Sequence, residues 1–513
     1  MRLLIGNGLP PCLQKDKLDE EVRLFRPVLK GALVSEGNWV EVSWQAIKGA
    51  ESYSIAISKD TFKTILQTLQ VDTTAHLFEQ LEWEKSYQFQ VRANAKDTVY
   101  NSKWSILGII KTPKFPTILN TPGINDVSDE AVRVSWTTSG AAVTSIKILK
   151  WADSSLVKEV PLTNDDVTKG FKIIPALAAN TQHIIFLYSG AAVRGWANFT
   201  TKQPFAGTVI DLRNITATSI LRDTLPDIPS GSIVLLQRGM TYLVDQQVNL
   251  AKTVTLLSGD DLTIALRATI AFTSNFNFET GSNIDSLVFR NVIIKGGAAN
   301  SYANHYLVNA TNVANVGKIN IENCQVEMLR GILRIRNGST IGDINISDCI
   351  IDSISGYSVV ALENATTAQN IAIRRSTIYK AEKIIASAAG GKTALIEDCT
   401  INEAPFGGNY VIDYASTNLT AGITMRNCII GIGKSNAGNT TGRGIRAGAA
   451  TTIDASNNYS TFDYAAASNP IPNLTAYSKT ALQLWNDPIN GDFTFKDNTF
   501  PGRATTGDPR WRK

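Results

Sequence analysis

The chain of 513 residues has few charged residues and no long apolar run. Asp, Glu, Lys and Arg make up 18% of it, and the formal net charge is only +4. No run of about 18 apolar residues occurs, which excludes a membrane-spanning helix. The small net charge, and the lack of a motif that combines aromatic with basic residues, argue against nucleic acid as a partner. Gly, Asn, Thr and Ile are plentiful instead, as is typical of β-rich extracellular proteins.

A short strand motif recurs through the second half of the chain. Copies separated by 23 to 32 residues indicate one supersecondary unit stacked on itself. Each copy has two apolar residues two positions apart, which indicates a strand with one buried face. The copies lie at 287–292, 319–324, 344–349, 371–376, 394–399 and 423–428, with a weaker one at 453–458.

Asn or Asp follows this strand in six of the seven copies and suits a left-handed backbone bend. The pattern predicts a parallel β-helix over about 206–486, with an asparagine ladder at one bend. Arg375 should interrupt the ladder with its side chain turned outward, because a guanidinium is not buried unpaired. The expected ladder residues are Asn291, Asn323, Asp348, Asp398, Asn427 and Asn457.

Four of the five cysteines occupy the equivalent inward position of a second strand, two residues before another apolar residue: Cys324, Cys349, Cys399 and Cys428. A zinc site is disfavoured because side chains stacked in a line do not converge tetrahedrally. A disulfide between Cys324 and Cys349 stays an alternative, although in-register neighbours fit the required torsion poorly. We expect a reduced, buried stack, since free Cys packs as a small hydrophobe.

A third strand completes each rung, at 307–311, 332–336, 359–363, 384–388, 411–415 and 444–448. Its second and fourth residues should point inward and its third and fifth outward. Stacked rungs align the outward residues on one extended face, as in other repeat folds. The outward third column reads Asn309, Arg334, Ala361, Ala386, Asp413 and Arg446, and beside it we expect Arg336, Glu363, Lys383, Tyr410 and Arg443.

The first 203 residues have the texture of β-sandwiches, with alternating strands and a Trp early in each repeat. Residues 25–113 and 114–203 each resemble a fibronectin type III domain, and Tyr87 matches the tyrosine corner of the first. His183 stands at the corner position of the second. A hydrogen-bonded structural histidine is favoured there over a functional one.

Residues 204–513 resemble a pectate-lyase-like right-handed parallel β-helix with a C-terminal extension. Residues 213–225 could supply a helical cap for its first rung, because a terminal rung needs one. The turn-rich segments 487–493 and 507–511 should fold back over the last rungs. The predicted fold is therefore all-β: two fibronectin type III-like β-sandwiches followed by the β-helix.

The layout as a whole, with the Leu24-Phe25-Arg26-Pro27-Val28-Leu29 start and the Gly507-Asp508-Pro509-Arg510-Trp511 ending, resembles a group of surface lipoproteins. These are associated with glycan-harvesting gene clusters of Gram-negative gut-type bacteria. The resemblance implies a cell-surface or outer-membrane location by lipid anchor, or secretion. It implies a polysaccharide partner, allows components of an outer-membrane glycan transporter, and brings no established catalytic residues. We expect a monomer.

The segment 1–24 is expected to be a tail or lipoprotein linker. Cys12 and the charged residues after it resemble a lipid-anchored cysteine with a surface-export signal. Leu9-Pro10-Pro11 is a poor lipobox, and Leu3-Leu4-Ile5 is too short for a signal core. Lipidation of Cys12 and an unstructured tail cysteine therefore both stay open.

Three functions from different classes fit these patterns. The first is a surface protein that binds an extended acidic polysaccharide with the outward columns: Arg334, Arg336, Glu363, Lys383, Tyr410, Asp413, Arg443 and Arg446. The second is a polysaccharide lyase that acts on a uronic-acid glycan by β-elimination, with Lys383, Arg334 and Arg446 as catalytic cations or base. The third is a structural spacer with a solvated polar face.

Two absences weigh against an enzyme. His305 is the only His of the solenoid and Asp413 stands alone in its column, so the Asp pairs and His of a polygalacturonase-type hydrolase are missing. No metal site is expected for the binding function. A lyase could hold a Ca²⁺ ion at Asp413 or Glu363, but the rung of Ala386 and Ala388 separates these acids. Binding is the favoured hypothesis.

Overall fold

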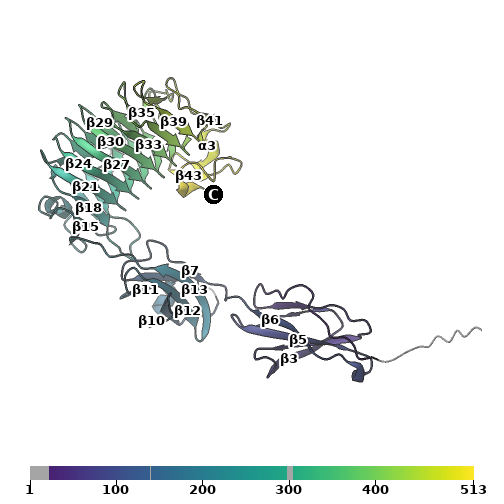
Figure 1. Ribbon diagram of the computed structural model, residues 1–513. Coiled ribbons are helices and arrows are strands. Elements are labelled where there is room, and N and C mark those ends of the chain that lie inside the picture. The colour runs from purple at the N-terminus through teal and green to yellow at the C-terminus, as the bar shows by residue number, and fades with distance from the viewer. Residues whose placement is uncertain (1–21, 139, 297–303, 513) are drawn as a thin grey trace, which may run out of the picture. The chain divides into compact units, whose positions relative to one another are not determined.

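A computed structural model describes residues 22–138, 140–296 and 304–512. Strands dominate throughout, and the predicted all-β fold class is confirmed: β-sandwich sheets come first and a parallel β-helix follows (Figure 1). Cys12 lies outside the described residues, so its lipidation stays a prediction.

The first sandwich combines a two-stranded sheet, β1-β4, with a four-stranded sheet, β3-β2-β5-β6. Trp44 is fully buried in the core that the two sheets share. The Tyr87 hydroxyl accepts a 2.9 Å hydrogen bond from the backbone N–H of Glu82, which is the predicted tyrosine corner. The elements are β1 (Val40–Ser43), β2 (Ser52–Ser58), β3 (Ile65–Val71), β4 (Ala75–Phe78), β5 (Ser86–Asn94), η1 (Thr98–Tyr100) and β6 (Ser105–Lys111).

The second sandwich has a three-stranded sheet, β11-β8-β7, and a four-stranded sheet, β10-β9-β12-β13. His183 is fully buried and stacks on Phe199 with ring centroids 5.1 Å apart, which agrees with a structural role. The elements are β7 (Leu119–Asn120), β8 (Val132–Trp136), β9 (Ser145–Lys150), β10 (Leu156–Pro161), α1 (Asn164–Lys169), β11 (Phe171–Ile174), β12 (Gln182–Ser189) and β13 (Ala192–Thr200).

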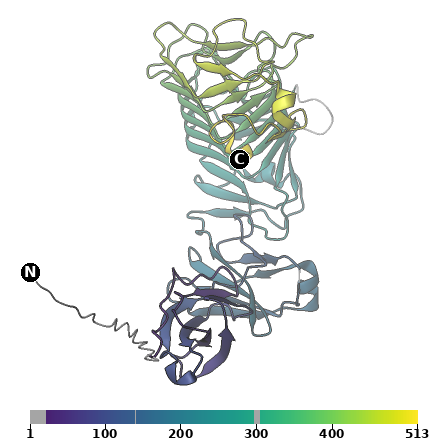
Figure 2. The ribbon, with the colours of Figure 1, turned by 90° about the vertical axis from the view of Figure 1, so that its right-hand side faces the viewer.

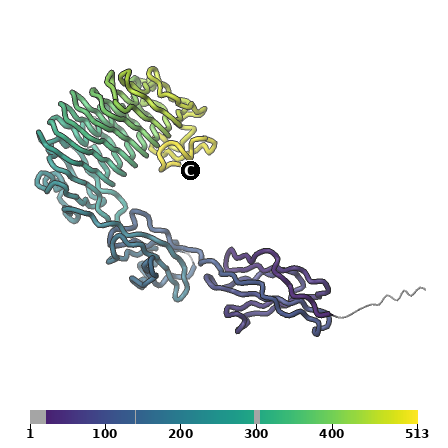
Figure 3. Tube along the Cα trace, viewed as in Figure 1, coloured from purple at the N-terminus to yellow at the C-terminus, as the bar shows by residue number. Residues whose placement is uncertain are grey.

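The solenoid consists of three parallel sheets, and from β15 to β38 each turn of the chain adds one strand to each of them in order. We name them sheets I, II and III. The stacked turns are visible in Figure 3. Sheet I contains β14 (Val209–Asp211), β15 (Ser232–Leu236), β18 (Val254–Ser258), β21 (Asn283–Arg290), β24 (Asn315–Glu322), β27 (Thr340–Ser347), β30 (Thr367–Arg374), β33 (Thr393–Glu397), β36 (Ile423–Arg426) and β39 (Ile453–Ser456).

Sheet II contains β16 (Thr241–Val244), β19 (Thr269–Phe272), β22 (Ile293–Gly296), β25 (Gln325–Leu329), β28 (Ile350–Ile354), β31 (Thr377–Ala381), β34 (Thr400–Asn402), β37 (Ile429–Ile430), β40 (Asn458–Ser460) and β41 (Leu474–Ala476). Sheet III contains β17 (Val248–Leu250), β20 (Phe276–Phe278), β23 (Tyr306–Ala310), β26 (Gly331–Ile335), β29 (Val360–Leu362), β32 (Ile385–Ser387), β35 (Tyr410–Asp413) and β38 (Arg443–Arg446). One apolar core fills the space that the sheets enclose.

The bend between sheets I and II carries the predicted ladder. All six Asn and Asp residues have φ between 50° and 58°, the left-handed region that these residue types tolerate best. Asn457 Nδ2 donates to Asn427 Oδ1 over 2.8 Å. The Arg375 side chain turns outward as predicted and pairs with Asp348 at 2.7 Å. Its backbone keeps φ at 46°, so only the side-chain ladder is interrupted.

The four solenoid cysteines are free thiols buried in the core, as predicted. The side chain at this position, a thiol or in one rung the hydroxyl of Ser376, accepts a hydrogen bond from the backbone N–H at the same position of the previous rung. The backbone N–H of Cys324 donates to Cys349 Sγ over 3.4 Å, and that of Cys349 donates to Ser376 Oγ over 3.0 Å. Burial raises the pKa of the Cys349 and Cys399 thiols well above the ordinary value.

Both ends of the solenoid carry added structure. At the start, α2 (Ile220–Thr224) buries Leu221 in the core, which confirms a helical cap. After the last rungs the chain folds back over the outer face of sheet II (Figure 2). Phe493 packs on Tyr379 of β31, and Trp485 packs on Phe493. This return reaches further back than the last rungs. Its elements are α3 (Ala481–Leu484), β42 (Trp485–Asp487), β43 (Asp492–Phe495) and η2 (Pro509–Trp511).

Candidate functional site

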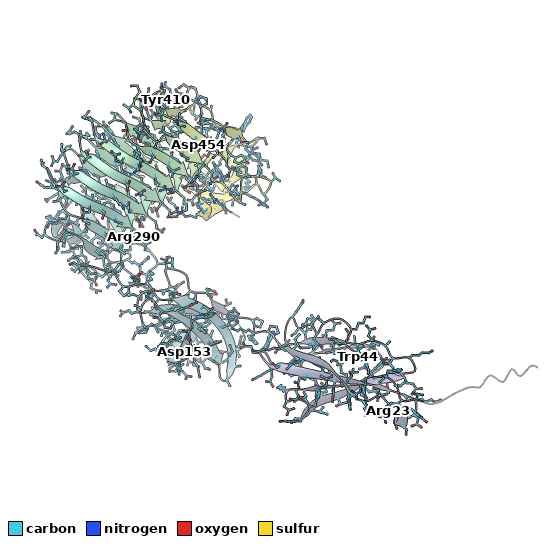
Figure 4. All side chains as sticks on the ribbon, in the orientation of Figure 1. Arg23, Trp44, Asp153, Arg290, Tyr410 and Asp454 are labelled. Atoms are coloured by element: carbon cyan, nitrogen blue, oxygen red, sulfur yellow. The ribbon has the colours of Figure 1, made fainter. Side chains whose placement is uncertain are left out.

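The outer face of sheet III carries the predicted column of outward residues. Strand pairing places each of its members directly beside the next one along the solenoid. In order they are Asn309, Arg334, Ala361, Ala386, Asp413 and Arg446. Tyr410, labelled on the solenoid in Figure 4, starts β35 and pairs with Arg443. The sequence pattern therefore gave the correct register for this face.

An arginine cluster occupies one end of the face. Arg334 pairs with Glu363 of the next rung, with Nη2 3.0 Å and Nε 3.2 Å from Oε2. The guanidinium carbon of Arg334 lies 3.7 Å from the ring centroid of Tyr357, and that of Arg330 lies 4.6 Å from the same ring. Burial lowers the pKa of Arg334, but the hydrogen bonds to Glu363, together with electrostatic attraction to Glu363 and the nearby tyrosines, outweigh it and leave the pKa raised. Arg334 is therefore a fixed cation.

A similar cluster lies further along the sheet. Arg446 donates from Nε and Nη2 to the two carboxylate oxygens of Asp413, both over 2.8 Å. Its guanidinium carbon lies 4.4 Å from the Tyr410 ring centroid, and that of Arg443 lies 5.2 Å from it. The hydrogen bonds to Asp413 raise the pKa of Arg446. Both clusters thus combine an arginine, a carboxylate and a tyrosine.

A shallow depression of about 260 Å³ lies between the two clusters. Its lining includes Ala361, Ala386 and Ala388, whose short side chains leave the space open. Lys383 belongs to the lining, and within the described ranges it has no ion-pair partner. The other polar members of the lining are Tyr357, Ser358, Glu363, Ser387 and Asp413.

Four of the predicted residues are less exposed or less free of partners than the sequence suggested. Tyr410 is only 9% exposed, and the guanidinium groups of Arg443 and Arg446 lie over its ring. Arg336 is partly buried and donates from Nη2 to Asn309 Oδ1 over 3.1 Å. Glu363 and Asp413 are engaged by arginines rather than free to hold a cation.

Tyr357 and Arg330 belong to the site but were not predicted. Tyr357 lies in a bend at 355–358 that lengthens its rung, and Arg330 lies between two strands. An aromatic residue beside Gly356 in the lengthened rung was the available signal. It was missed because loop residues do not follow the strand alternation from which the columns were read.

In the part of the chain that the structure describes, no group of three or more His, Cys, Asp or Glu residues is arranged to hold a metal ion. No helix among residues 22–138, 140–296 and 304–512 is long and apolar enough to cross a bilayer.

Two families match the solenoid region. A domain of unknown function (DUF4957) matches residues 240–381, and a second domain of unknown function (DUF5123) matches residues 394–511. The first covers the solenoid from β16 to β31, and the second covers the last rungs together with the C-terminal return. A search of curated proteins found no match.

Two solved structures with similarity to the chain contain fibronectin type III domains. The FN1–FN3 domains of chicken CNTN1 are 15% identical over 36% of this chain and 68% of that one, with a TM-score of 0.17. A two-domain fibronectin type III segment of chicken tenascin is 15% identical over 35% of this chain and 99% of that one, with a TM-score of 0.22. The sandwich assignment rests on the sheets and the tyrosine corner described above.

Proposed function

We propose that the outer face of sheet III binds an extended acidic polysaccharide at the cell surface. The observation that carries the proposal is the open depression at Ala361 and Ala386, with a fixed arginine beyond each end. Lys383 lies in its lining and has no ion-pair partner in the described part of the chain. The two sandwich domains would serve as spacers, and a glycan transporter of the outer membrane would be a partner.

Shape and charge both support this function. From Arg334 to Arg446 the column makes four rung steps of about 4.8 Å, or roughly 19 Å, which suits a linear chain better than a compact ligand. The face carries net positive charge, because its cations outnumber its two acids, Glu363 and Asp413. The cations are Arg330, Arg334, Arg336, Lys383, Arg443 and Arg446. Exposed ion pairs are individually weak, so affinity should be modest and should fall with added salt.

Catalysis of β-elimination is the second candidate function of this face. The reaction needs a cation to neutralise a uronate carboxylate and a base to take the C5 proton. The raised pKa values of Arg334 and Arg446 suit the first task and oppose the second. Lys383 is therefore the base candidate of a lyase.

One set of measurements tests both functions. The purified chain is run through gels that contain uronic-acid or neutral polysaccharides, while absorbance of the unsaturated product is followed in solution. For a binding protein, Lys383→Ala should weaken retention by about tenfold or less, and absorbance should stay flat. For a lyase, the same variant should abolish product while retention largely survives.

A matched charge control separates a site from general electrostatics. The triple variant Arg334→Ala, Lys383→Ala, Arg446→Ala removes three cations from sheet III. Arg290→Ala, Lys318→Ala, Arg426→Ala removes three exposed cations from sheet I. We expect only the first variant to lose retention of acidic glycans. If acidic glycans retained the sheet III variant and the sheet I variant equally, the outer face of sheet III would be ruled out as the binding site.

A further inference from the structure

Two of the arginines beyond the ends of the depression, Arg334 and Arg446, already have anionic partners from the chain itself. Glu363 lies 3.0 Å from Arg334, and Asp413 holds Arg446 through two hydrogen bonds of 2.8 Å. A ligand carboxylate placed at either arginine would also lie beside the protein's own carboxylate, and like charges at such range repel. The ends of the site therefore favour hydroxyl groups, which can donate to the carboxylates and accept from the guanidinium groups.

The middle of the site is different. The rung of Lys383 lies between the rung of Glu363 and the rung of Asp413, and its own outward residues are Ala386 and Ala388. Lys383 is the cation of the described lining and has no ion-pair partner among the described residues. A single anionic group would be matched here, and a second one would meet Glu363 or Asp413.

We infer that the glycan bound on sheet III is sparsely charged, with one acidic sugar at Lys383 and uncharged sugars on both sides of it. This inference rests on the proposed function and narrows its ligand class. It excludes homopolymers that carry a carboxylate on every sugar as the preferred ligand. The preferred ligand is a polysaccharide in which neutral sugars separate the uronic acids.

A graded series of one polymer tests the inference. Polygalacturonate is reduced stepwise, so that a rising fraction of its carboxyl groups becomes hydroxymethyl while chain length stays constant. Gel retention is measured for each member at one ionic strength. The wild-type chain should be retained most by a partly reduced polymer, and less by the fully acidic and the fully neutral ones.

Two variants locate the effect. Lys383→Met keeps the aliphatic stem and removes the charge, so retention should no longer depend on acidic groups and should fall to the level of the neutral polymer. Glu363→Gln with Asp413→Asn keeps shape and removes both acids. It should improve retention of the fully acidic polymer by about two- to fivefold and move the optimum towards it. Lys318→Met on sheet I is the matched control, and thermal unfolding checks that each variant is folded.

The outcomes are distinct. Wild-type retention that rises steadily with carboxyl content would overturn the sparse-charge inference and leave glycan binding in place. Retention that is highest for the neutral polymer would overturn the role of Lys383. No retention of any member, neutral or acidic, would remove the proposed function together with this inference.

Discussion

At the scale of single residues, the cysteine column limits both size and polarity at one position of each rung. Cys349→Ala removes the acceptor of the Cys324 N–H and leaves a small cavity, so we expect a loss of about 1–2 kcal/mol in unfolding free energy. Cys349→Ser should cost less, because Ser376 accepts an equivalent bond one rung later. Cys349→Asp should cost most, since it buries a carboxylate. Urea unfolding gives the order, and equal losses for Ala and Ser would contradict the role of the hydrogen bond.

The same burial predicts slow chemistry at these thiols. Only the thiolate reacts with common thiol reagents, and burial raises the pKa of Cys349 and Cys399. We expect labelling of both residues in the native protein to be no faster than the opening of the solenoid, and to become fast in urea. Peptide mass mapping identifies each site, and rapid native labelling of Cys349 would contradict its inward placement.

At the scale of elements, the N-terminus of α1 in the second sandwich depends on ionised Asp166. This carboxylate accepts hydrogen bonds from Lys172 Nζ at 2.8 Å and from the Thr163 N–H at 2.9 Å. The hydrogen bond from Lys172, followed by those from Thr163, lowers the pKa of Asp166 from 3.8 to about 2. Because the folded-state pKa lies below the unfolded value, the stabilisation is complete above about pH 4 and is lost as the pH falls towards 2.

Asp166→Asn should therefore destabilise the second sandwich at neutral pH, and its difference from wild type should shrink between pH 4 and pH 2. Thermal unfolding across this range measures the effect. Asp165→Asn is the control on the same helix, since the Asp165 side chain is 68% exposed and its ion-pair partner among the described residues is Lys169. A difference for Asp166→Asn that does not vary with pH would show that its charge is not what stabilises the helix start.

The C-terminal return depends on one threonine of β31. Thr377 Oγ1 donates to Asp508 Oδ2 over 2.8 Å and accepts from Trp511 Nε1 over 2.7 Å. Thr377→Val keeps the volume and removes both bonds, which leaves buried polar groups short of partners. We expect a loss of about 1–3 kcal/mol and faster hydrogen exchange in β31 and β34. Thr393→Val, on the outer face of sheet I, should lose less, and unchanged exchange in β31 would contradict the anchoring role.

The repeat pattern predicted some of these features and not others, for a physical reason. Some positions recur once in every rung, such as those of Asn323 and Arg334, and strand alternation with parallel register determines where they lie. The ladder and the outward column could therefore be predicted from the sequence. Tyr357 and the return over Tyr379 depend on bends of variable length and on contacts between residues far apart in the chain. The pairing of Arg446 with Asp413 depends on side-chain torsions, which the pattern does not specify.

At the scale of the whole molecule, the pairing of arginines with carboxylates explains why the charges counted in the sequence do not describe the site fully. The chain is nearly balanced, with 49 basic and 45 acidic side chains, and on sheet III two Arg–carboxylate pairs neutralise two of the six cations of the face. Read from the sequence, the arginines were free cations for an acidic glycan. Arg334 and Arg446, paired as they are, hold hydrogen-bonding groups in fixed positions, and Lys383 is the cation of the depression that a ligand can neutralise.

The length of the face predicts how binding depends on the length of the glycan. The span of roughly 19 Å from Arg334 to Arg446 corresponds to about four sugar units. Affinity measured by calorimetry should therefore rise with oligosaccharide length up to about a tetrasaccharide and then level off. Arg446→Ala shortens the face at one end, so its affinities should level off at a shorter oligosaccharide while the shortest ligands bind as they do to wild type. Affinity that continues to rise well beyond this length, equally in both proteins, would place the glycan on a different surface.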